Sequence, residues 1–161
     1  MTRQVSLMPG WALFSVFLFF FLCDYYIFVP LWDISLGTMV PVFIWIYSLG
    51  VIGFRALPQN INMSKGKFLT TFAYTVGFHI ITSLRLDVGI PYGIKGPFLF
   101  LAWLSFLYSI YFVTKCIKCV ELNRTAVPSE WISIFAGLLL YPIGVWFIQP
   151  KIQNIARTHE V

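Results

Sequence analysis

Long uninterrupted runs of apolar residues, separated by short polar segments, dominate the pattern along the chain. Five such runs stand out, each of about 18–22 residues, close to the ~20 that an α-helix needs to cross a bilayer. The runs are continuous rather than alternating, which favours helices over membrane β-strands. The pattern therefore predicts transmembrane helices over residues 9–30, 36–54, 68–86, 97–114 and 131–149.

The composition supports the same class of protein. Of the 161 residues, 59% are hydrophobic and only 11% are charged, and the mean hydropathy is +0.83. In soluble proteins about a quarter of the residues are charged, so this chain is too apolar for a soluble domain. We expect one integral-membrane domain over residues 1–161, folded as an all-α polytopic bundle of five transmembrane helices, or of four if the first or last run does not cross.

The basic residues stand singly at the ends of the apolar runs and predict an orientation. With the N-terminus inside the cell, seven Lys and Arg flank the inner helix ends and four flank the outer ends. Because basic residues mark the cytoplasmic side, the N-terminus is expected inside and the C-terminus outside, in the inner or plasma membrane if the protein is bacterial. The inner set is Arg3, Arg55, Lys65, Lys67, Lys115, Lys118 and Arg124, and the outer set is Arg85, Lys95, Lys151 and Arg157.

The same scattering of charges bears on the partners of the protein. The net charge is +5, yet no stripe of basic residues is available for a phosphate backbone, so nucleic acid is not an expected partner. The bilayer with its anionic headgroups is expected instead, together with other membrane subunits or further copies of the chain. Asn62 and Asn123 begin Asn-x-Ser/Thr sequons, which would face the lumen of a eukaryotic membrane only in the inverted orientation, so that orientation stays an alternative.

Residues 70–87, TTFAYTVGFHIITSLRLD, carry more hydrogen-bonding side chains than a lipid-facing segment needs. When the segment is wound at 100° per residue, about a third of the helix circumference is shared by Thr71, Thr75, His79, Thr82 and Ser83. Two interpretations of this polar face stay open. Either the hydroxyls bond backbone carbonyls four residues earlier and neighbouring helices, as is common in membrane helices, or they line a cavity or pathway for a ligand.

Charged residues close this segment at its predicted outer end. Arg85 and Asp87 stand in the last turn, and Lys95 lies in the Gly- and Pro-rich loop that follows. If the segment lines a pathway, Arg85 and Lys95 would attract an anionic group. In the alternative interpretation, Arg85 extends to the membrane interface and pairs with Asp87.

Asp24 falls within the first apolar run, where a carboxylate costs about 3 kcal/mol on insertion scales. A residue of this kind pairs with a cation, binds an ion or relays a proton. However, Tyr25 and Tyr26 follow it and would set it at the interface if the span began earlier. If the protein is an enzyme, His79 with Asp24 or Asp87 would supply its acid and base groups.

Cys116 and Cys119 form a C-x-x-C pair, a spacing found in redox and metal sites. The one further cysteine is Cys23, and no histidine stands near the pair, so neither a metal site nor a cofactor is expected. The pair also falls on the predicted inner side, where thiols stay reduced. Nucleotide-binding, zinc-protease and serine-hydrolase motifs are absent from the sequence.

Small residues recur on one face of each of the last two predicted helices. Such faces let helix backbones approach closely, either within one bundle or against another subunit. The residues are Ala102, Ser105 and Ser109 in the fourth helix and Ser133, Gly137 and Gly144 in the fifth.

Three functions are compatible with these observations. The first is a non-catalytic subunit or accessory protein of a membrane assembly, which the missing catalytic motifs and the minimal loops favour. The second is transport or binding of a lipid, a lipophilic molecule or an anion in an intramembrane cavity lined by Thr and His. The third is a small membrane enzyme for a lipophilic substrate, although the sequence leans against catalysis.

Overall fold

The computed structural model describes residues 8–23, 36–83, 89, 91–140 and 143–158. Over these residues the chain is all-α, as the sequence predicts, and no strand occurs. Only one of the described helices, over Gly93–Leu122, is long and apolar enough to cross a bilayer by itself. The helices are α2 (Gly10–Cys23), α3 (Leu36–Arg55), α4 (Lys65–Ser83), α5 (Tyr92–Leu122), α6 (Pro128–Leu139) and α7 (Ile143–Thr158).

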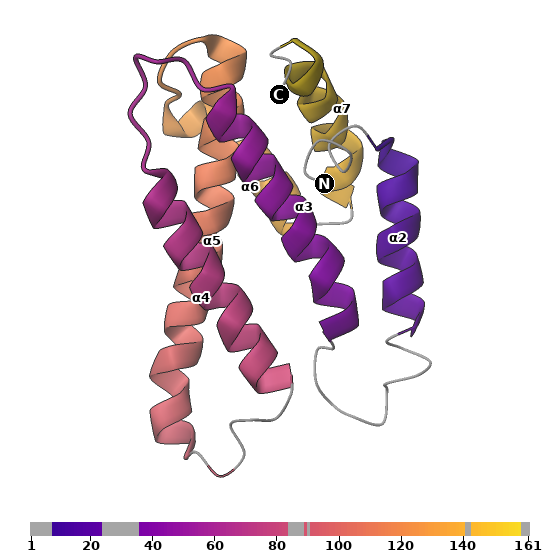
Figure 1. Ribbon diagram of the computed structural model, residues 1–161, viewed down its shortest axis with the longest axis vertical. Helices are drawn as coiled ribbons and strands as arrows, with labels where there is room; N and C mark the ends of the chain where they lie inside the picture. The colour runs from indigo at the N-terminus through magenta and orange to yellow at the C-terminus, as the bar shows by residue number, and fades with distance from the viewer. Residues whose placement is uncertain (1–7, 24–35, 84–88, 90, 141–142, 159–161) are drawn as a thin grey trace.

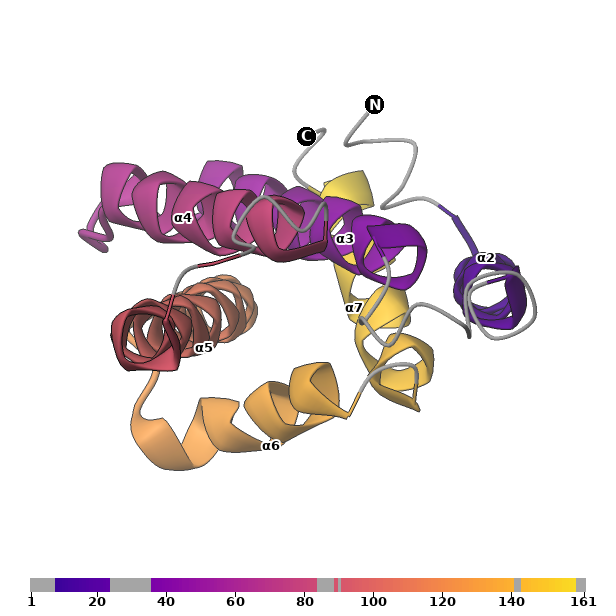
Figure 2. The same ribbon diagram turned by 90° about the horizontal axis from the view of Figure 1, so that it is seen from below.

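The helices α2 to α5 run alternately along the long axis of the molecule, and α6 and α7 form a hairpin beside them (Figure 1). In this view α2 and α4 run downward and α3 and α5 run upward, so the loop between α3 and α4 lies at the same end as the end of α5. Seen from below, α3 and α4 form one row, and α5 and α6 lie opposite it (Figure 2). Two helices are central: α3 contacts α2, α4, α5 and α7, and α5 contacts α3, α4, α6 and α7.

The predicted fifth helix is divided into two. A single helix is expected over residues 131–149, whereas α6 ends at Leu139 and α7 begins at Ile143. Pro142 stands between them in the sequence, and proline lacks an N–H and disfavours a helical residue before it. After this break α7 runs back upward (Figure 1), so it ends at the same end of the molecule as the α3–α4 loop rather than at the opposite end that a fifth crossing requires.

The core is concentrated between α3 and the helices around it. Trp45 and Leu49 of α3 are 1% and 0% exposed. Next to them, the ring of Phe68 in α4 stacks on the ring of Phe112 in α5, with centroids 4.7 Å apart and planes inclined by 14°. A Cβ atom at Gly50 of α3 would lie only 2.4 Å from the Phe68 ring. The bare backbone at Gly50 therefore lets this aromatic stack approach α3 closely.

The hairpin of α6 and α7 depends on a backbone contact between two glycines. A Cβ atom added to Gly144 would lie 1.9 Å from the carbonyl oxygen of Gly137, far inside van der Waals contact. These two residues were expected to share one face of a single helix with Ser133. Because the helix is broken after Leu140, Gly137 and Gly144 instead face each other from two helices, and Ser133 is exposed.

We expect Gly144→Ala to lower the free energy of unfolding by about 1–3 kcal/mol, because the added methyl group must push α6 and α7 apart. Thermal unfolding of the purified protein, followed by circular dichroism, measures this loss. Gly77→Ala is the matched control, since nothing lies within 4 Å of a Cβ atom at Gly77. Replacing this helical glycine is expected to be neutral or to stabilise by up to about 1 kcal/mol. Equal melting temperatures for the two variants would contradict the tight crossing of α6 and α7.

Candidate functional site

The threonine hydroxyls of α4 are used within their own helix. Thr71 donates to the carbonyl of Lys67 at 2.9 Å, Thr75 to that of Thr71 at 3.0 Å, and Thr82 to that of Phe78 at 3.0 Å. These are the bonds four residues back that Ser and Thr commonly make in membrane helices. With their protons committed, these hydroxyls have no donor left for a ligand.

The same polar face also meets α5. The Thr75 hydroxyl is buried and lies 3.5 Å from the carbonyl oxygen of Ala102. Ala102, Ser105 and Ser109, the small residues of α5, are 7%, 7% and 0% exposed. Ser109 in turn donates to the carbonyl of Ser105 at 2.9 Å. The small residues thus lie inside the bundle, where they allow α4 and α5 to pack closely.

His79 is the exception on this face. Its Nε2 atom is buried and has no hydrogen-bond partner among the residues that the structure describes. The imidazole ring meets the ring of Phe43 in α3 edge-on, with centroids 5.4 Å apart and an interplanar angle of 79°. An unsatisfied buried polar atom costs about 1–3 kcal/mol. Nε2 is therefore the polar atom of α4 that a ligand or a partner would satisfy.

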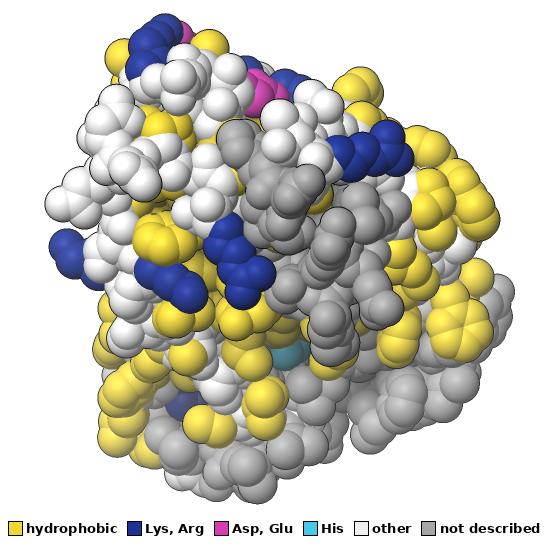
Figure 3. Space-filling model, turned by 45° about the horizontal axis from the view of Figure 1, so that its top comes forward, with side chains coloured by type: hydrophobic (Ala, Val, Ile, Leu, Met, Phe, Trp, Pro, Cys, Tyr) yellow, Lys and Arg dark blue, Asp and Glu magenta, His cyan; other side chains and the backbone are white. Residues whose placement is uncertain are grey.

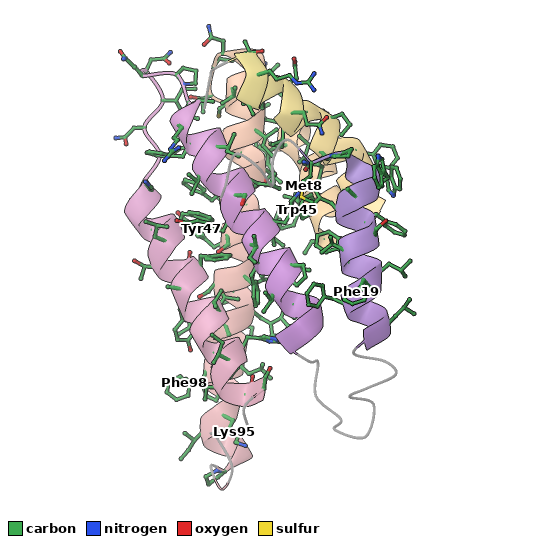
Figure 4. The ribbon with its side chains drawn as sticks, turned by 45° about the vertical axis from the view of Figure 1, so that its right-hand side comes forward. Met8, Phe19, Trp45, Tyr47, Lys95 and Phe98 are labelled. Atoms are coloured by element: carbon green, nitrogen blue, oxygen red, sulfur yellow. The ribbon has the colours of Figure 1, made fainter. Side chains whose placement is uncertain are left out.

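A shallow apolar groove lies between α3 and α4, and the ring of Phe43, one of its lining residues, contacts the ring of His79. The groove has a volume of about 340 Å³. Ser48 is one of its lining residues, and the Ser48 hydroxyl donates to the carbonyl of Ile44 at 2.7 Å. Figure 4 shows Tyr47 on the side of α3 that faces α4, and its ring lies 5.7 Å from that of Phe72. The groove is lined by Val40, Phe43, Ile44, Tyr47, Ser48, Phe72 and Val76.

Several predicted site residues do not meet this groove within the described structure. Asp24, Arg85 and Asp87 lie outside the described residues, so a pairing of His79 with Asp24, or of Arg85 with Asp87, stays a prediction. Lys95 lies near the lower tip of α5 (Figure 4), beyond the apolar segment that includes Phe98. Ser83 is not free, because it makes an interaction of its own. Of the predicted pathway residues, the groove therefore approaches only His79.

Gln149 is a buried polar residue that the sequence pattern marks only as the last residue of the predicted helix over 131–149. Its side chain is 0% exposed. Its Oε1 accepts the indole N–H of Trp45 at 3.1 Å, and its Nε2 donates to the backbone carbonyl of Met8 at 2.9 Å. Gln153, one turn later, donates to the same carbonyl at 2.8 Å. Met8 and Trp45 lie close together in Figure 4, so Gln149 joins α7 both to α3 and to the residue that precedes α2.

Charged side chains gather at the upper end of the bundle, which we call the basic end. Figure 3, with this end turned toward the viewer, shows most Lys and Arg side chains over it and many hydrophobic side chains below. Of the nine Lys and Arg that the structure describes, Lys95 alone lies at the opposite end (Figure 4). The basic end carries Arg55, Lys65, Lys67, Lys115, Lys118, Arg124, Lys151 and Arg157.

Both described carboxylates lie at the basic end and are engaged there. Glu121 of α5 binds Lys151 of α7 at 3.1 Å and so ties the two helices together. Glu130 accepts the backbone N–H of Val127 at 2.9 Å and pairs with Arg124. The Val127 N–H and the Arg124 guanidinium hold the pKa of Glu130 below its usual value, and they fix the start of α6.

The C-x-x-C pair is built into the core. Cys116 and Cys119 are free thiols, and each is 0% exposed. The Cys116 sulfur lies 3.8 Å from that of Met63, and Cys119 accepts the backbone N–H of Ala126 at 3.4 Å. Among the described residues, no group of three or more His, Cys, Asp or Glu could hold a metal ion. This geometry is that of packing residues.

No known protein family, curated protein or solved structure matches this chain. The chemistry of the described residues is therefore the basis on which a function is proposed.

We expect Gln149→Leu to destabilise the protein by about 1–3 kcal/mol, because the Trp45 indole would lose its acceptor inside the core. Chemical unfolding of purified variants would measure the loss. Trp45→Phe removes the indole donor, so the double variant should lose less than the sum of the two single variants. Gln153→Leu is the matched control, since the Met8 carbonyl then keeps Gln149 as a donor. Additive losses for Gln149 and Trp45 would contradict the coupling.

Proposed function

We propose that this chain is a small multi-pass integral membrane protein that acts as a non-catalytic, accessory component of a membrane assembly. In this proposal α2 to α5 belong to membrane-crossing segments, which corresponds to the four-helix alternative for the bundle. The hairpin of α6 and α7 enters the bilayer from the basic end and returns to it.

The observation that carries the membrane placement is the surface of α5. Phe98, Leu99, Phe100 and Leu101 are consecutive, and their side chains are 52%, 49%, 66% and 49% exposed. Consecutive residues of a helix point 100° apart, so apolar side chains are exposed almost all round this part of α5. A helix that is apolar on every side requires either a protein core or a bilayer around it.

The distribution of charge supports the same placement and gives it an orientation. Eight of the nine described Lys and Arg lie at the basic end, whereas the predicted orientation placed six of these nine inside and three outside. The increase arises because α7 returns, bringing Lys151 and Arg157 to the basic end (Figure 1). By the positive-inside rule, the basic end is the cytoplasmic one.

The role as an accessory component rests on how the polar groups are used. The described threonine hydroxyls of α4 bond backbone carbonyls, and the C-x-x-C thiols are buried. Away from the basic end, the described surface is mainly apolar: it consists of the exposed half of α5 and shallow grooves between helices. Such a surface suits contact with lipid and with other membrane helices.

We expect Gln59 and Thr158 to be accessible from the same side of the membrane and Gly93 from the other. Single cysteines at these exposed positions, in a variant without the native cysteines, would be labelled with a membrane-impermeant maleimide in sealed vesicles of known orientation. The physical reason is the return of α7 to the end of the molecule at which the α3–α4 loop lies. Labelling of Thr158→Cys together with Gly93→Cys would contradict the hairpin and favour a fifth crossing.

Purification from the native membrane in mild detergent tests the accessory role. We expect a stoichiometric protein companion, identified by mass spectrometry of the purified sample. A chain that is isolated alone or as a homo-oligomer, with a bound lipid or metabolite, would contradict this role and favour the second candidate function.

The second candidate is binding of a lipophilic small molecule in the groove between α3 and α4. The buried Nε2 of His79 favours it, since a ligand with one polar group would satisfy this atom while its apolar part lies along Phe43 and Val76. His79→Leu is then expected to release a co-purifying molecule, with at least about a tenfold loss of affinity for a lost buried hydrogen bond. Thr82→Val is the matched control, because its hydroxyl serves only the backbone. Retention of the molecule by His79→Leu would exclude this site.

A further inference from the structure

A second shallow groove lies between α5 and α6, and its character changes along its length. Its walls are apolar and mostly aromatic, with a volume of about 360 Å³. At the end near the basic end, the ring of Tyr111 meets that of Trp131 edge-on, with centroids 5.1 Å apart. The groove is lined by Leu107, Tyr108, Tyr111, Trp131, Ile132 and Phe135.

The ammonium of Lys115 lies beside Tyr111, one of the residues that line this groove. The Lys115 ammonium donates to the hydroxyl of Tyr111 at 3.0 Å and lies 5.5 Å from the centre of its ring. Among the residues that the structure describes, Lys115 has no ion pair with a carboxylate. By contrast, Lys118 and Lys151 both bind Glu121, at 2.6 and 3.1 Å. Lys115 therefore keeps its charge available for an anion.

Among the described residues, the positive charge at the basic end exceeds the negative charge. Eight described Lys and Arg face two carboxylates there, and both carboxylates already have partners. The aromatic residues Tyr111 and Trp131 lie where the charged end meets the apolar body, the position that Tyr and Trp favour at membrane interfaces. From Lys115 to Leu107 the groove descends about 12 Å along α5, away from the charged end.

We infer that the groove between α5 and α6 binds an anionic phospholipid, with the phosphate on Lys115 and one acyl chain along the aromatic wall. Charge complementarity selects this occupant: the site offers one cation at the headgroup level and only apolar surface below it. The exposed apolar side chains of the groove favour contact with an acyl chain. The ammonium of Lys115, which has no carboxylate partner among the described residues, favours an acidic headgroup over a zwitterionic one. This inference rests on the proposed membrane placement.

Tryptophan quenching by brominated lipids tests the site in the full-length protein. The protein is reconstituted in phosphatidylcholine vesicles that contain a minor fraction of either brominated phosphatidylglycerol or brominated phosphatidylcholine. The chain has six Trp, so the quenching in the Trp131→Phe variant is subtracted from that in the wild type. The difference is the quenching of Trp131 in the groove. We expect brominated phosphatidylglycerol to bind there about 5-fold more strongly than brominated phosphatidylcholine.

Two lysine variants separate a built site from general attraction to the basic end. Lys115→Gln is expected to abolish the preference for the anionic lipid. Lys65→Gln is the matched control, since Lys65 lies at the same end but over the ring of Phe54, away from the groove, and it should keep the preference. Loss of the preference in both variants, or in neither, would overturn the site.

The quenching itself distinguishes this inference from the membrane placement. Equal quenching of Trp131 by the two brominated lipids would overturn the anionic site and leave the membrane placement standing. If neither lipid quenches Trp131, both the anionic site and the membrane placement are overturned.

Discussion

The contact between the backbones of Gly137 and Gly144 determines how the second half of the molecule is arranged. No side chain fits between these residues, so α6 and α7 cross closely and the chain reverses. The reversal brings Gln149 against Trp45 in the core and Lys151 against Glu121 at the basic end. A continuous helix over the same residues would carry Lys151 and Arg157 away from the other basic residues. The charge asymmetry of the bundle thus follows from two positions that lack side chains.

The polar face of α4 illustrates how little a pattern of residue types says about their use. Thr71, Thr75 and Thr82 look alike in the sequence and in the structure, because each bonds a carbonyl of its own helix. His79 occupies the same face, but an imidazole cannot reach back to its own backbone in this way, so its Nε2 atom depends on a neighbour. The chemical difference between a hydroxyl and an imidazole, rather than their shared position, separates packing from available function on this face.

Hydropathy and periodicity predict the helices that are long and uninterrupted. The expected helix over 36–54 is observed as α3 over Leu36–Arg55, and the all-α class is confirmed. The prediction of one helix over 131–149 is wrong, because average hydropathy does not detect a break between two apolar helices. Both α6 and α7 are apolar, and Pro142 adds only a local signal. The predicted helix ends at residue 149, just before Pro150, whereas the structure accommodates this proline inside α7. Gln149 was overlooked for a related reason, since its role depends on Trp45 and Met8, more than one hundred positions away.

The bonds from Gln149 and Gln153 to the Met8 carbonyl join positions that are far apart in the sequence, with separations of 141 and 145 residues. During synthesis α2 emerges before α7, which supplies both glutamines. The Met8 carbonyl therefore stays without these donors until α7 has been made. Closure of α2 onto α7 must follow synthesis of the helices between them, which ties correct placement of α2 to a much later stage of biogenesis than its own synthesis.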